Sequence, residues 1–191
     1  MNFWKAGFFI LSGLVVATVV TLVVYIGNPG DSEEIPSGKV ASTSSNHLVV
    51  KATKEDFEGI ANTYINKAMK GEKLPVKMEI GNDIVLSSEL TVFSITVPVT
   101  MHFDPIVRED GNLILKQSTV EIGNYNLPPS TVLKILRDSV KLPPWMIVRP
   151  KEEELFIDLS AIALSGNLSV KAKEFNLEND EILLEIIIPN E

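Results

Sequence analysis

The feature that most constrains this chain is an uncharged apolar segment, AGFFILSGLVVATVVTLVVYI, which runs from Ala6 to Ile26. A helix of about 20 residues crosses the ~30 Å hydrocarbon core of a bilayer. Trp4 and Tyr25 lie near its two ends, where amphipathic rings favour the membrane interface. The segment is longer than the apolar region of a signal peptide and has no small-residue cleavage site after it. We predict a transmembrane signal anchor over residues 6–26, the alternatives being a cleaved signal peptide or a buried soluble helix.

The charges that flank this segment predict its orientation. Lys5 and the α-amine precede it, whereas Asp31, Glu33 and Glu34 follow it. Because cytoplasmic flanks carry the excess of basic residues, residues 1–5 are expected to be a short cytoplasmic N-terminus. The chain is therefore expected to be a single-pass protein of the cell membrane whose C-terminal domain is extracellular.

Composition limits the chemistry of that domain. The 191 residues include no cysteine, which excludes disulfides, thiolate metal sites and cysteine nucleophiles. The net charge is −8, and this acidic balance argues against nucleic-acid binding and against purely electrostatic adhesion to anionic lipid. The 45% of hydrophobic residues are enough for a core.

The remainder divides into a linker and one domain. Residues 27–48 are predicted to be a flexible linker, because this stretch is rich in Gly, Pro, Ser and Asn. Residues 49–191 are predicted to form one extracytoplasmic domain. It begins with an amphipathic helix over residues 54–70, for which Thr53 and Asp56 are placed as a capping box.

Alternation of apolar and polar residues dominates the sequence after this helix. The stretch VFSITVPVTMHF, residues 92–103, is predicted to be a strand with one apolar face, and a phase change near Val92 suggests a bulge. Pro98 cannot donate a ladder hydrogen bond, so this strand is expected at a sheet edge or with a bulge at that residue. Further strands are expected at residues 74–80, 84–90, 113–122, 145–148, 154–159, 168–175 and 181–188, with turns between them.

These elements predict an α+β fold. It consists of an N-terminal transmembrane helix, then a long amphipathic helix packed on a coiled antiparallel sheet, and a second short helix over residues 130–140 that lies between two Leu-Pro-Pro corners. Such a sheet wrapped on a helix leaves an elongated apolar trough. Trp145, which follows the second corner, is expected to be a core anchor or a residue of the groove mouth or of the membrane interface.

The sequence contains no recognisable catalytic motif. His47 lies in the predicted linker, and His102 with Asp104 is too small a set for a metal site. The acidic residues Glu152, Glu153 and Glu154 are expected in a solvated turn, and there is no phosphate-binding loop and no serine in a nucleophile motif. We therefore expect no catalysis, no cofactor and no metal.

Three stretches carry a resemblance to a known family: FDPIVREDGNLILKQSTVEIGNYNLPPSTVLKIL, LPPWMIVRPKEEELFIDL and KEFNLENDEILLEIIIP. They resemble the YpmS family of uncharacterised Gram-positive bacterial proteins, over residues 49–189 and, in architecture, over the anchor. The resemblance implies a location in the cell membrane and an extracytoplasmic domain, and it supplies no catalytic residues. At the level of the fold, a long helix on a coiled sheet is also similar to tubular lipid-binding proteins.

The function expected is a membrane-anchored module that binds a lipid or another amphiphile of the cell envelope. The candidate groove residues, each of which has closed core as its simpler interpretation, are Phe57, Ile60, Tyr64, Ile65, Phe93, Ile95, Val97, Val99, Met101 and Phe103. The alternative is a scaffold or regulatory partner of an envelope enzyme, which binds a protein through an exposed sheet edge. A lipid binder requires a continuous apolar cavity, whereas a scaffold requires a filled core and an external apolar patch.

Overall fold

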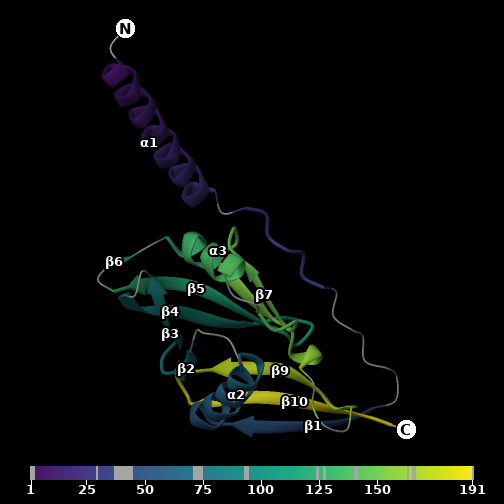
Figure 1. The fold of residues 1–191 in the computed structure, drawn as a ribbon. Helices are drawn as coiled ribbons and strands as arrows, with labels where there is room; N and C mark the ends of the chain where they lie inside the picture. The colour runs from purple at the N-terminus through teal and green to yellow at the C-terminus, as the bar shows by residue number, and fades with distance from the viewer. Residues whose placement is uncertain are drawn as a thin grey trace.

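The fold was obtained as a computed structural model that describes residues 3–28, 30–36, 45–70, 75–92, 95–123, 125–126, 128–139, 142–162, 164 and 167–190. An N-terminal helix projects from an α+β domain (Figure 1). The elements are α1 (Phe3–Gly27), β1 (Ser45–Ala52), α2 (Lys54–Ala68), β2 (Val76–Ile80), β3 (Ile84–Val92), β4 (Ile95–Val107), β5 (Leu113–Ile122), β6 (Tyr125–Asn126), α3 (Pro129–Ser139), β7 (Met146–Arg149), β8 (Glu154–Ile157), the 3-10 helix η1 (Leu159–Ala161), β9 (Ser169–Asn176) and β10 (Glu181–Pro189).

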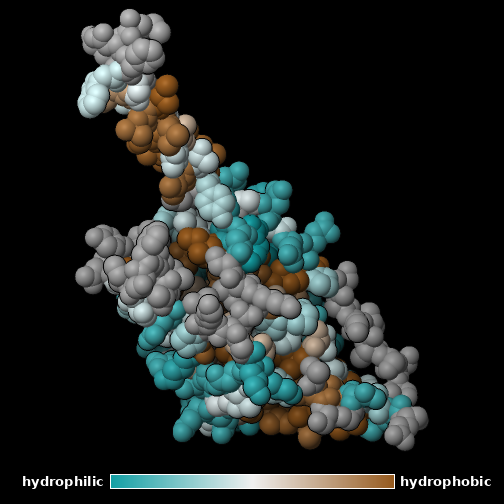
Figure 2. All heavy atoms as spheres, viewed as in Figure 1, coloured by the Kyte–Doolittle hydropathy of each residue, from teal (hydrophilic) through white to brown (hydrophobic). Residues whose placement is uncertain are grey.

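Helix α1 is apolar on all sides and stands away from the domain for most of its length. Figure 2 shows hydrophobic side chains along it, in contrast with the largely hydrophilic face of the domain below. Within the described part of the chain, it is the one helix that is long and apolar enough to cross a membrane, over Gly7–Tyr25, and the domain buries none of that stretch. A helix that is apolar all round is suited to a lipid environment. Helix α1 is therefore a candidate membrane anchor.

The strands form two antiparallel sheets. The small sheet has the order β1-β10-β9, and the large sheet has the order β2-β3-β4-β5-β8-β7, with β6 beside β5. The predicted α+β class is confirmed, although the strands divide between two sheets where the sequence predicted one. Strand β1 begins at Ser45, inside the predicted linker, and pairs with β10 along its whole length.

The segment around Val92 is a hairpin. Val92 is paired with Ile95 in an antiparallel ladder, so the chain reverses between β3 and β4. The predicted bulge near Val92 is therefore wrong, because the phase change in the sequence marks the change of strand. A register shift does occur in β4, between His102 and Phe103 opposite β5.

Pro98 does not mark a sheet edge. Strand β4 lies between β3 and β5, and Pro98 is paired with Glu89 of β3. The Pro98 carbonyl accepts from the N–H of Gly123, beyond the end of the β5 ladder, which begins at Val99. The N–H and C=O groups of one residue in an antiparallel strand point to the same side. The position of the missing N–H of Pro98 therefore faces the β5 side, just beyond the end of that ladder, and no ladder hydrogen bond is lost.

Helix α2 lies along β2, one of the two edge strands of the large sheet. Its predicted capping box is confirmed: the Thr53 hydroxyl accepts from the backbone N–H of Asp56, and the Asp56 carboxylate accepts from the backbone N–H of Thr53. The Asn62 amide bonds both the N–H and the C=O of Met78 in edge strand β2, each at 2.8 Å. The helix therefore satisfies edge groups that would otherwise be free to pair with another chain.

Candidate functional site: an apolar cavity between the sheets

A cavity of about 360 Å³ lies between α2 and the facing strands of the two sheets. One wall comes from β2, β3, β4, β5 and β8, and the other comes from β1, β9 and β10. Helix α2 contributes a complete side, with Phe57, Ile60, Ala61, Tyr64, Ile65 and Ala68. The lining is almost entirely hydrocarbon, and Ser88, Tyr64 and Trp145 carry the polar groups among its side chains. Such a space favours an apolar guest over water, which needs several polar partners.

The size of the cavity suits an alkyl chain. An apolar protein cavity of about 150 Å³ accommodates benzene, so this cavity has room for on the order of a dozen carbon atoms. Its volume is also within the roughly 300–1,000 Å³ range of small-molecule sites. The cavity is therefore larger than a packing defect in a closed core.

The cavity reaches the surface beside α2. Ile60 lines it and yet is 53% exposed, and Ala68, two turns further along the same face, is also exposed. Near the N-terminus of α2, the rings of Phe57 and Phe175 meet edge to face with centroids 5.0 Å apart and join α2 to β9. The helix is thus fixed at one end and borders an opening along its exposed side.

The structure brings together five of the ten candidate residues. Those that line the cavity are Phe57, Ile60, Tyr64, Ile65 and Met101. Phe103 and Val99 are buried in the core outside the lining, and Val97 is half-buried with its side chain toward Gly123. Phe93 lies outside the described residues, and for Ile95 the backbone alone is described, paired with Val92.

Sequence reasoning missed the strands that form the opposite walls. Leu113 and Leu115 enter the cavity from β5, and Leu184 and Ile186 enter it from β10. Their alternating pattern predicted strands, but the pattern does not say which sheet a strand joins. Trp145, which follows the second Leu-Pro-Pro corner, is half-buried and lines the cavity.

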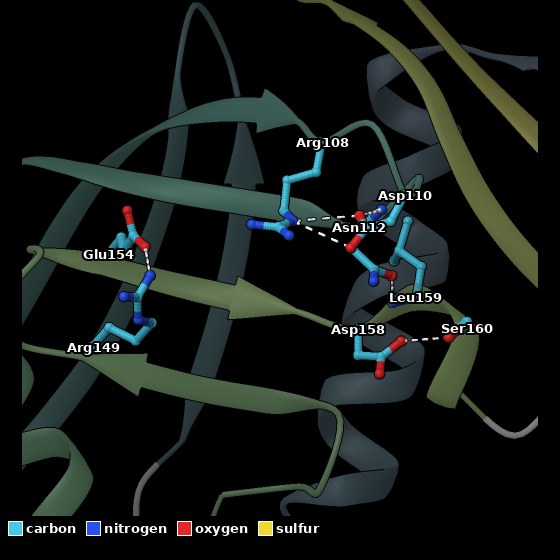
Figure 3. A network of polar contacts seen from close by, with 8 residues as sticks. All are labelled: Arg108, Asp110, Asn112, Arg149, Glu154, Asp158, Leu159 and Ser160. Atoms are coloured by element: carbon cyan, nitrogen blue, oxygen red, sulfur yellow. Dashed lines mark hydrogen bonds and ion pairs between the residues drawn. The ribbon is translucent and has the colours of Figure 1, made fainter. Parts of the chain in front are cut away.

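A polar network holds one end of the two-sheet body (Figure 3). The Asn112 carbonyl oxygen accepts from the N–H of Leu159, and the Asp158 carboxylate accepts from Ser160 and caps η1. Gly111, with φ of +84°, accepts from the N–H of Ala172 in β9. The Asn112 amide and the Asp158 carboxylate are thus engaged in fixing turns, and the Gly111 carbonyl joins β9 to the large sheet. Glu154, expected in a solvated turn, is instead buried in β8, where Arg149 Nη1 donates to its carboxylate.

Among the described residues that line the cavity, Tyr64 is the one titratable group, and the histidines lie elsewhere. His102 Nδ1 lies 2.7 Å from Asp83 Oδ2 on the outside of the β3–β4 pair, and His47 Nδ1 lies 3.1 Å from Glu185 Oε1 on the small sheet. The Lys173 ammonium beside Glu185 holds the pKa of that carboxyl below its usual value. Among the described residues no group of three or more His, Asp or Glu is placed to hold a metal ion.

Comparison with known proteins places the chain in a family. Residues 2–188 match the family described as uncharacterized protein conserved in bacteria (DUF2140). The chain belongs to the DUF2140 family. It is 31% identical over 182 residues, 95% of each chain, to the uncharacterized protein YpmS of Bacillus subtilis (strain 168). No solved structure matches this DUF2140 chain, so the similarity to tubular lipid-binding folds stays a prediction.

Proposed function

We propose that this DUF2140 protein is a membrane-anchored, non-catalytic module that holds the alkyl part of a lipid or another envelope amphiphile in the cavity between its two sheets. The observation that carries the proposal is the cavity of about 360 Å³ with a nearly all-hydrocarbon lining. The candidate anchor α1 supports it, because the helix would keep the domain at a lipid surface.

The proposed topology has residues 6–26 in the cell membrane and the domain outside. It follows from Lys5 on one side of the anchor and Asp31, Glu33 and Glu34 on the other. In this position the domain meets envelope lipids rather than cytosolic metabolites.

The proposed binding is driven by apolar transfer. Each methylene taken from water into the cavity contributes roughly 0.8 kcal/mol, whereas a chain taken from a bilayer gains far less because it was already in an apolar medium. Specificity for a headgroup would then depend on residues at the mouth beside Ile60.

One residue that pointed to the scaffold alternative does not mark an edge. Pro98 was the possible mark of an exposed edge, and it lies in an interior strand. The edge strand β2 is covered by Asn62 and by Glu58, whose carboxylate accepts from the N–H of Ile80 at 2.8 Å.

The test is lipid retention by the domain that starts at Ser45, produced without detergent and first shown to unfold cooperatively. Native mass spectrometry and lipid extraction should find a stoichiometric amphiphile. Ala61→Phe, which fills the cavity, should abolish retention, whereas Thr63→Phe, which puts the same ring on the exposed side of α2, should leave it intact. An apo mass that persists after incubation with total bacterial lipid would reject the proposal.

A further inference from the structure

The last turn of α1 is attached to α3 by polar contacts. The Nζ of Lys134 donates to the main-chain oxygens of Tyr25, at 2.7 Å, and Asn28, at 2.6 Å. It also lies 3.9 Å from the centre of the Tyr25 ring. The Tyr25 hydroxyl donates to Oδ2 of Asp138 at 3.1 Å. One face of α3 therefore holds both the backbone and the side chain of the end of the anchor.

Lys134 is the centre of this attachment. It is 8% exposed, and a lysine is rarely buried to this extent unless its ammonium is paired. Its partners are main-chain carbonyls at the C-terminal end of α1. These carbonyls find no N–H donor within the helix, and they form the negative end of its dipole. The lysine thus caps a helix from a different element of the chain.

The attachment continues beyond the helix end. Arg137 Nη1 donates to the main-chain oxygen of Asp31 at 2.8 Å, and Arg137 also holds the pKa of Asp138 below its usual value through a hydrogen bond to that carboxylate. The Ser32 hydroxyl oxygen is buried against the domain, and Ser32 lowers the pKa of Glu152 at the tip of the β7–β8 hairpin. The first residues of the predicted flexible linker therefore lie against the domain.

The opposite face of α3 belongs to the core and to the cavity. Val132 and Leu133 are buried, and Leu136 lines the cavity. Figure 1 shows α1 meeting the domain at α3, with β1 and α2 at the other end of the molecule. A single helix thus separates the end of the anchor from the apolar space.

We propose that these contacts fix the domain on the bilayer in one orientation, with α3 and the tip of the β7–β8 hairpin against the lipid headgroups and with β1 turned away. The α3 side of the cavity then faces the membrane. The orientation requires only that α1 spans the bilayer, and it turns the mouth of the cavity beside Ile60 of α2 away from the headgroups.

The absence of cysteine makes the test direct, because single cysteines can be introduced into the full chain. Lys151→Cys, at the hairpin tip, and Lys51→Cys, on β1, replace two exposed lysines at opposite ends of the domain. Each variant is labelled with a fluorophore and reconstituted in phosphatidylcholine vesicles that contain a lipid with a nitroxide on its headgroup. Quenching should be several-fold stronger for the label at residue 151 than for the label at residue 51.

Lys134→Met should reduce this difference, because it removes the donor to both carbonyls. Arg137→Gln, at a partly exposed side chain, is a second variant in case Lys134→Met fails to fold, and Lys67→Met on α2 is the control expected to change nothing. Equal quenching of the two labels would overturn the proposal. A difference in quenching that persists in folded Lys134→Met and Arg137→Gln protein would also overturn it. Lipid retention by the domain without α1 is measured separately, so either proposal can fail while the other stands.

Discussion

Helices α2 and α3 are both amphipathic, but they have different surroundings. In α3 the inward residues Val132 and Leu133 meet a filled core and are 5% and 0% exposed. In α2 one residue, Ile65, is buried, while Ile60 on the same apolar stripe is 53% exposed. An apolar stripe shows which face of a helix turns inward, but it does not show whether the space behind that face is filled.

The largest effect is expected when a large inward side chain is removed from each helix. Leu133→Ala in α3 should lower the free energy of unfolding by about 3 kcal/mol, because it leaves a void in close-packed surroundings. Ile60→Ala in α2 should cost less than about 1 kcal/mol, because that side chain is already half in solvent. Urea unfolding of both variants measures the contrast, and equal losses would show that α2 also packs on a filled core.

Adding volume should sharpen the same comparison. Val132→Phe in α3 should destabilise the domain by about 2 kcal/mol, because a close-packed site must distort to accept a ring. Ala61→Phe in α2 should change stability by less than about 1 kcal/mol, since the ring enters the cavity. Thermal unfolding compares the two. If Ala61→Phe proves the more damaging substitution, the cavity is not available to a guest.

The helix starts provide a smaller test. Helix α2 has less packing behind it and begins with a complete capping box, so Thr53→Ala should cost about 1 kcal/mol. Ser130→Ala, in the first turn of α3, should cost a few tenths of a kcal/mol, as is usual for a surface substitution away from a cap. The measurement is the increase in hydrogen exchange that each substitution causes at the first turn of its helix. A larger increase in α3 than in α2 would contradict this expectation.

The smallest effect concerns pH and α3. Because Arg137 lowers the pKa of Asp138, the stabilisation from the Tyr25–Asp138 contact is fully present above the ordinary Asp value of about 3.9 and is lost as the pH falls through the lowered value. The quenching difference between labels at residues 151 and 51 should therefore persist at about pH 5 and decline only below about pH 4. Asp138→Asn should remove this step, and a decline centred near neutral pH would assign it to another group.

Local features were predictable because neighbouring residues determine them. The apolar helix α1, the capping box at Thr53 and the turns that join β4 to β5, β7 to β8 and β9 to β10 all follow from composition, spacing and Gly, Pro or Asn. Strand β1 was missed because its first residues, Ser45 to His47, continue the polar composition of the linker. Nothing in that stretch indicates its pairing with β10.

The candidate site was predictable on α2 and much less so on the sheets. The helical period grouped Phe57, Ile60 and Tyr64 on one stripe, and all three line the cavity. On β4 the alternation grouped Met101, which lines the cavity, with Phe103, which does not. Which of these two residues lines the cavity depends on how the two sheets face each other, and alternation along one strand does not show this. The role of Lys134 could not be predicted, because its partners lie more than a hundred residues away along the chain.

The pairing of β1 with β10 has a consequence for biosynthesis. Ser45 is paired with Pro189, so β1 must wait for β10, which is made more than a hundred residues later. Contacts between distant parts of a chain form late, since they require closure of a long loop. The apolar space therefore lacks one wall until β10 has been made, and until then the leucines and isoleucines that the large sheet contributes to it are accessible to whatever hydrophobic molecule is nearby.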